Sequence, residues 1–209
     1  MTETQWLTSE FPIPLLHFAA ANRLLSSRKA KLFSCAYCRQ KWDSIPTGYL
    51  RRTIELIERY ADCPVSSQEV KIAIEDVTSI TESIGINAVS QIMKLALDKT
   101  IIATTVCSLA TSQLNVKKQI DKTNRQLTDL VREIFPYSDR PFDSAWRSGA
   151  VLELATGMYD SRDFAAMPIL ADSLEESGCH DAVILDHCRD SNRDHVKGCW
   201  AVDLVMGKQ

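Results

Sequence analysis

Hydrophobic residues recur along most of the chain at the three- and four-residue spacing of an α-helix, and no segment shows the strict alternation of a strand. The clearest example is 115–134, where one face is apolar and the opposite face carries lysine and aspartate. Its apolar stripe consists of Val116, Ile120, Leu127, Leu130, Val131 and Ile134. The pattern predicts an all-α protein, an irregular multi-helix bundle of about 8–10 helices.

Start and stop signals divide this pattern into separate helices. Pro14 suits the first position of a helix that runs to about Leu25, and Ser26 or Ser27 can cap the next helix. Ser66 and Glu69 form the S-x-x-E pattern of a capping box ahead of a further apolar stripe. Gly178 directly follows the predicted helix 164–177. Many helices end with a glycine in the left-handed conformation at this position.

The middle of the chain is the most apolar part. Residues 88–111 are apolar nearly all round, which predicts one helix buried in the middle of the bundle. The segment FPYSDRPFD, at 135–143, is the clearest loop, and a helix around 146–159 and two short C-terminal helices lie beyond it. We expect a single all-α domain over 1–209, with the loop 135–143 as its one lobe boundary.

Net charge and hydropathy limit the classes of protein to which the chain can belong. A formal net charge of −3 disfavours broad nucleic-acid binding, which needs a positive surface. The N-terminal third is locally basic, and we expect its charges to lie on a solvated face. These residues are Arg28, Lys29, Lys31, Arg39, Lys41, Arg51 and Arg52. Neither a signal peptide nor an apolar run of about 18 residues is recognisable, which predicts a cytoplasmic protein without a membrane span.

The chemistry-bearing residues are concentrated in GCHDAVILDHCRDSNRDHVKGCW, at 178–200. This window holds three of the seven cysteines and three of the four histidines. On a helix, the spacing of His195 and Cys199 would place both side chains on one face, and zinc takes four such N or S ligands. The predicted zinc ligands are Cys179, Cys188, His195 and Cys199. The alternates are Cys35, Cys38 and His187, although neighbours such as His187 and Cys188 point about 100° apart on a helix.

Two other interpretations of the window stay open. Free cysteine packs as a small hydrophobe, so these residues can simply fill a core, and this suits Cys63 and Cys107 as well. A cysteine nucleophile is the sharper alternative, but no glycine-rich turn flanks any cysteine. Phosphate-binding loops and the common hydrolase and metalloprotease motifs are also missing from the sequence. We therefore expect a protein without enzymatic activity, and the sequence names no small-molecule substrate.

Two blocks of the chain carry a family resemblance. The first comprises Trp6-Leu7, RKAKLFSCAYCRQKW at 28–42 and RRTIELIERYAD at 51–62; the second is 168–208, preceded by Trp146 and Tyr159. Together they resemble an uncharacterised bacterial helical family that is abundant in planctomycetes. Its members combine a tryptophan-bearing start, a basic Cys-Arg-Trp helix and a Cys/His-rich tail. The resemblance implies a coherent fold and a meaningful tail, but no activity.

Taken together, the sequence predicts a cytoplasmic helical module that binds another protein. The first alternative is a zinc-stabilised module whose C-terminal tail holds the metal. The second is a cysteine-dependent enzyme or a component of a defence system.

Overall fold

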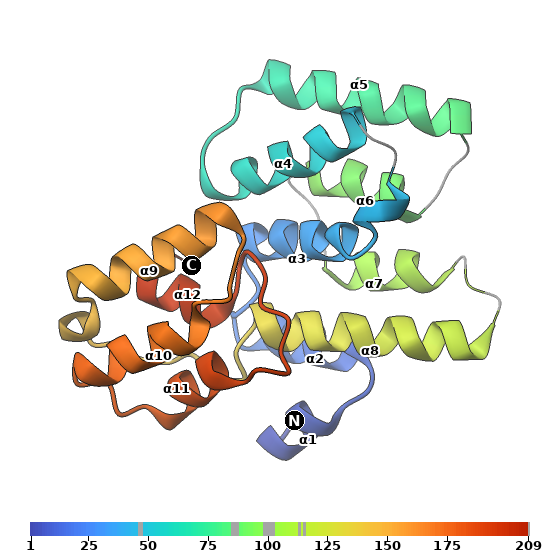
Figure 1. Cartoon of the computed structure of the whole chain (residues 1–209). Coiled ribbons are helices and arrows are strands. Elements are labelled where there is room, and N and C mark those ends of the chain that lie inside the picture. Colours follow the sequence, from blue (N-terminus) through green and yellow to red (C-terminus); the bar gives the residue numbers. More distant parts are fainter. Residues whose placement is uncertain (46–47, 85–87, 98–102, 113, 115, 209) are drawn as a thin grey trace. The chain divides into compact units, whose positions relative to one another are not determined.

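The computed structural model describes residues 1–45, 48–84, 88–97, 103–112, 114 and 116–208. These residues form twelve α-helices and two short 3-10 helices and contain no strand, so the all-α prediction is confirmed. The chain divides into two compact units, unit 1 (Met1–Tyr137) and unit 2 (Ser138–Gln209) (Figure 1). The division falls within the segment 135–143, where the loop was predicted.

Unit 1 contains eight α-helices among its described residues. They are α1 (Glu3–Thr8), α2 (Pro12–Ala21), α3 (Ser27–Arg39), α4 (Tyr49–Asp62), α5 (Ser67–Ile84), α6 (Ala88–Leu97), α7 (Ala103–Ser112) and α8 (Lys117–Ile134), with a 3-10 turn at Trp42–Ser44. The predicted caps of α3 and α5 are confirmed: the Ser26 hydroxyl accepts from the Lys29 N–H, and Ser66 and Glu69 form the reciprocal capping box. The predicted start at Pro14 is wrong, because α2 already begins at Pro12.

The central helix of unit 1 is α3. It packs against α4, α6, α7 and α8, and every residue from Ala30 to Cys38 is buried. Two polar residues within this stretch are accommodated locally. The Lys31 ammonium donates to the Ser27 hydroxyl at 2.7 Å and lies 5.0 Å from the centre of the Tyr60 ring, and the Ser34 hydroxyl donates to the Ala30 carbonyl. Of the seven basic side chains expected on a solvated face, Lys31 is buried, Arg52 is exposed and the other five are partly buried.

The segment 88–111, which was predicted as one buried helix, contains two helices instead. The structure has two helices there, α6 and α7, and residues 98–102 between them lie outside the described part of the chain. Each helix buries one face: Ile92, Met93 and Ala96 on α6, and Val106, Cys107 and Ala110 on α7. The all-round apolar pattern arises because α6 and α7 pack against each other as well as against α3.

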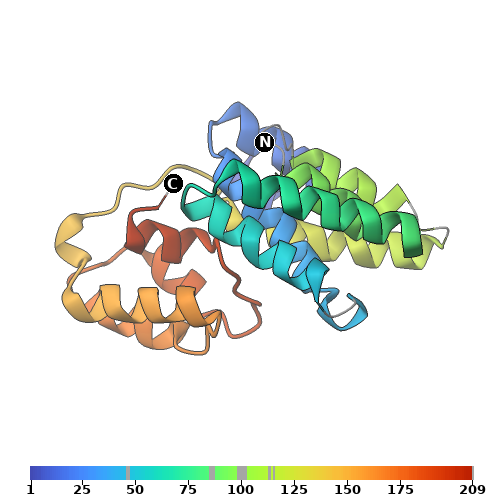
Figure 2. The same cartoon turned by 90° about the horizontal axis from the view of Figure 1, so that it is seen from above.

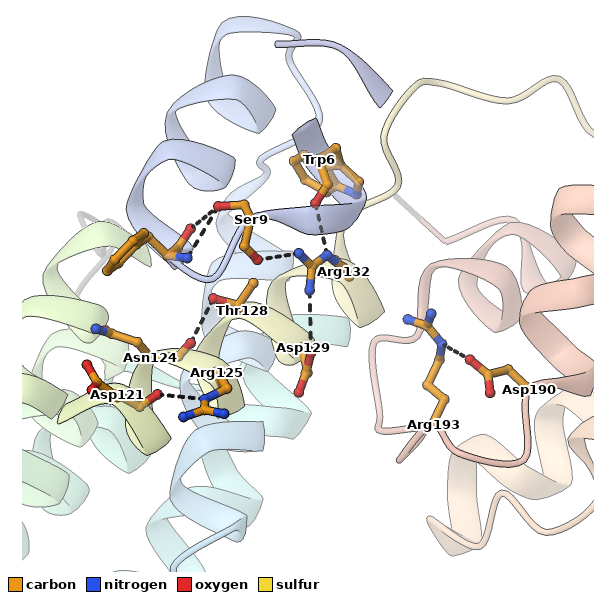
Figure 3. A network of polar contacts seen from close by, with 11 residues as sticks. Trp6, Ser9, Asp121, Asn124, Arg125, Thr128, Asp129, Arg132, Asp190 and Arg193 are labelled. Carbon is orange, nitrogen blue, oxygen red and sulfur yellow. Dashed lines mark hydrogen bonds and ion pairs between the residues drawn. The ribbon is translucent and has the colours of Figure 1, made fainter. Parts of the chain in front are cut away.

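Arginine side chains connect the helices of unit 1 through hydrogen bonds and ion pairs. Arg132 of α8 donates to the backbone carbonyls of Trp6 and Ser9, which ties the α1 segment to α8 (Figure 3). Arg39 at the end of α3 makes a two-pronged ion pair with the buried Glu58 of α4. The indole of Trp42 lies 4.6 Å from the Arg39 guanidinium and 4.7 Å from that of Arg51. These basic side chains are structural contacts within unit 1.

Unit 2 is a closed group of four α-helices. They are α9 (Gly149–Ser161), α10 (Met167–Glu176), α11 (Ala182–Arg189) and α12 (Trp200–Met206), preceded by a 3-10 turn at Ser144–Trp146. α10 packs against both α9 and α11, and α12 also packs against both (Figures 1 and 2). The four helices enclose an apolar core that includes Leu170, Leu174, Ile184, Val202 and Val205.

Polar contacts define the ends of these helices. Ser148 caps α9, and the Asp181 carboxylate caps α11 while it pairs with Arg140 at 3.0 Å. Arg147 donates to the last carbonyls of α12. Gly178, at φ 90°, has the predicted left-handed conformation, so that Cys179 turns back toward α10 and its N–H donates to the Leu174 carbonyl at 2.9 Å.

No helix in the described part of the chain combines the length and apolar character needed to cross a bilayer.

Candidate metal centre

Three side chains of the C-terminal window converge inside unit 2. They are His187 in the last turn of α11, His195 in the segment 190–199, and Cys199 directly before α12. The Cys199 sulfur lies 3.2 Å from His187 Nε2 and 3.9 Å from His195 Nδ1. One ligand atom from each residue lies within 4.8 Å of the others.

These separations match the edges of a zinc coordination sphere. With Zn–N of about 2.1 Å and Zn–S of about 2.3 Å, tetrahedral angles place a nitrogen and a sulfur about 3.6 Å apart. The two observed N···S distances, 3.2 and 3.9 Å, lie on either side of that value. Small side-chain adjustments would therefore bring the three atoms onto one ion.

The segment between α11 and α12 brings the ligands together. The predicted helical pairing of His195 with Cys199 is wrong, because neither residue belongs to a helix. Instead, the Cys199 N–H donates to the Val196 carbonyl at 2.9 Å, which closes a tight turn, and Gly198 adopts φ 96° within it. Cys199 then occupies the N-cap position of α12, while His187 points from the end of α11.

The cluster is largely buried and lies beside aromatic side chains. His187 is 7% exposed and Cys199 is 0% exposed, and the imidazole of His187 packs 4.5 Å from the Trp200 ring and 5.1 Å from that of His195. Burial, reinforced by the positive charge of Arg193 and by His195, lowers the pKa of His187 to about 2. The imidazole is therefore neutral at physiological pH, which is the form that binds metal ions.

The other predicted ligands lie elsewhere. Cys179 and Cys188 belong to the apolar core of unit 2, and burial raises the pKa of the Cys179 thiol. Cys188 follows His187 on α11, and the two side chains diverge as adjacent helical positions must. Among the described residues neither thiol is part of a group of three potential ligands.

Cys35 and Cys38 are core residues of unit 1. Both are buried on α3, where the Cys35 thiol contacts the Ile54 carbonyl at 3.7 Å and burial raises the pKa of Cys38 to about 12. Cys107 is likewise buried in α7, as expected. Cys63 is exposed at the end of α4, so the expectation that it fills a core is wrong.

The geometry favours metal binding over nucleophilic catalysis. A catalytic thiol needs access to substrate and a base that can hold a proton as an imidazolium. The Cys199 sulfur belongs to a fully buried residue, and the low pKa of His187 disfavours the imidazolium. One thiol and two imidazoles, facing one another, are instead a typical donor set for a borderline-soft cation.

Comparison of the chain with protein-family models, with curated proteins and with solved structures gives no match in any of the three. The resemblance to the planctomycete-abundant family therefore stays a prediction, and the assignment of function depends on the geometry of the chain itself.

Proposed function

We propose that the chain is a metal-stabilised helical module in which unit 2 binds one zinc ion through His187, His195 and Cys199. The observation that carries the proposal is the convergence of one sulfur and two imidazole nitrogens, with N···S distances of 3.2 and 3.9 Å. With three protein ligands, a water molecule would complete the tetrahedron of the ion, and the binding free energy of a metal site is linked to folding.

Zinc fits this donor set better than calcium or magnesium. Those cations are bound by oxygen ligands, whereas thiolate and imidazole suit zinc and its neighbours in the transition series. None of the seven cysteines, all within described residues, forms a disulfide. This supports a reducing cytoplasmic setting for the proposal, in which a thiolate stays available to the metal.

The ion would connect the two ends of the segment between α11 and α12. Residues 190–199 form no helix, and α12 is only seven residues long, so local helix propensity contributes little to their order. A metal bound to His187 at one end and Cys199 at the other would hold this segment closed. It would also fix α12 against α9 and α11.

Removal of the metal tests this role. We expect that a strong chelator lowers the melting temperature of unit 2 and exposes residues 190–199 to proteolysis, and that one equivalent of zinc restores both. At free zinc about 1,000 times the dissociation constant, binding stabilises the folded state by about 4 kcal/mol. Magnesium serves as the matched control, because it should not restore the folded state. Identical melting curves with and without chelator would contradict the proposal.

Binding of another protein is the second candidate function. It is supported by an apolar groove along α9 that none of the three proposed ligands lines.

A further inference from the structure

Unit 2 carries a groove of about 660 Å³ between α9 and the segment that leads into α10. One wall is a continuous stripe of α9, from Ala150 to Ser161, at positions i, i+3, i+4, i+7, i+8 and i+11. The other wall is formed by residues between Asp163 and Ala166. Leu154 and Met158 supply the large apolar side chains, and alanines line much of the remainder.

Gly157 lies at the middle of this stripe, in the interior of α9. Glycine is about 1 kcal/mol less favourable than alanine in a helix interior. No described atom of the chain packs beside it, since a Cβ added at Gly157 would meet no atom within 4 Å. The space that a side chain would fill is thus available to a group that approaches the α9 backbone from outside.

The rim of the groove is acidic. Glu153 and Asp163 lie on opposite walls, and Glu153 is exposed and makes no ion pair with any described residue. Unit 2 as a whole contains thirteen Asp and Glu residues against seven Lys and Arg, a net charge of −6 with histidine neutral. An apolar floor with acidic edges complements a partner surface that presents apolar side chains flanked by lysine or arginine.

From these features we propose that the α9 groove binds a basic amphipathic helix of a partner protein. The partner helix places apolar residues at i, i+3 or i+4, and i+7 over Leu154 and Met158, and its backbone passes close to Gly157. Its Lys or Arg residues face Glu153 and Asp163. This inference rests on the second candidate function, partner binding, and is independent of the zinc site.

A pair of synthetic peptides tests the charge of the partner. Both are amphipathic helices of about 20 residues with the same leucine face, and they differ only in carrying lysine or glutamate on the polar face. Fluorescence anisotropy with the full chain, as purified, should show that the lysine peptide binds at least about tenfold more tightly than the glutamate peptide. The difference should shrink in high salt. Equal binding of the two peptides, or no binding of the lysine peptide, would overturn the proposal.

Gly157→Leu tests the position of the binding site. The new side chain enters the groove without a clash within unit 2, and leucine favours the helix, so the melting temperature should not fall. Affinity for the lysine peptide should fall about tenfold or more. Gly149→Leu is the matched control, because Gly149 begins the same helix, has the same open space around it and does not line the groove.

Two results with these variants would contradict the inference. One is unchanged peptide binding by Gly157→Leu. The other is self-association of the wild-type chain in sedimentation experiments that Gly157→Leu abolishes, since the occupant would then be a second copy of this chain. The peptide measurements can be interpreted even if the chain does not bind zinc, because no proposed metal ligand lines the groove.

Discussion

Cys199→Ala is expected to abolish tight zinc binding and to unfold the C-terminal part of unit 2. The substitution removes the sulfur of the three-ligand cluster, which lies 3.2 Å from His187 Nε2 and 3.9 Å from His195 Nδ1. Loss even of groups that only support metal ligands lowers affinity about 10- to 100-fold, so loss of the thiolate should exceed that range. Because metal binding is coupled to folding, the variant should melt at a lower temperature and its stability should no longer respond to chelator.

Cys188→Ala is the matched control for this experiment. Cys188 comes from the same window and the same apolar core as Cys199 and is equally buried, but it is not part of the three-ligand cluster. Its replacement should cost about 1 kcal/mol for the small cavity and leave zinc binding intact. Equal stability losses in Cys199→Ala and Cys188→Ala, with neither variant sensitive to chelator, would show that Cys199 is a packing residue.

The second large effect is expected in unit 1, from Arg39→Ala. Glu58 is 2% exposed, and its carboxylate accepts two hydrogen bonds from the Arg39 guanidinium. Removing one partner of a buried ion pair leaves a buried charge behind, which costs about 3 kcal/mol. The substitution also removes one of the two guanidinium groups that flank Trp42. Chemical denaturation monitored by tryptophan fluorescence should record the loss.

Arg59→Ala provides the comparison for Arg39→Ala. Arg59 pairs with Glu69 at the surface, where both side chains are about half exposed and solvent screens the interaction. The melting temperature should therefore change little. In the Arg39→Ala background, replacement of Glu58 with leucine should recover part of the stability, because it removes the buried charge. If Arg39→Ala and Arg59→Ala behave alike, the α3–α4 ion pair does not stabilise unit 1.

Helix type and several boundaries were predictable because they depend on local signals. The amphipathic stripe of α8 and the Ser66–Glu69 capping box are both local, and the structure contains both. The buried status of α3 was not predictable in this way. Lys31 and Ser34 make the helix look polar, and only their contacts with Ser27, Tyr60 and the Ala30 carbonyl allow them to be buried.

Only part of the candidate site was predictable from the sequence, because the ligands are brought together by the path of the chain between α11 and α12. His195 and Cys199 do approach each other, but through a turn at Gly198, which hydrophobic periodicity does not describe. His187 was only an alternate, and no local pattern separates it from Cys188, because both are buried on α11 together with Ile184 and Leu185. Whether Cys179 is a metal ligand or a core residue depends on how α10 packs against α11, and no local sequence pattern specifies that packing.

The central claim is that His187, His195 and Cys199 hold one zinc ion, and the metal content of the purified, untagged chain tests it most directly. Elemental mass spectrometry combined with thiol titration should find about one zinc per chain, and the Cys199 thiol should react only after a chelator is added. A chain without bound metal, in which the reactivity of Cys199 changes only on unfolding and not on chelation, would contradict the claim and would leave the cluster as packing.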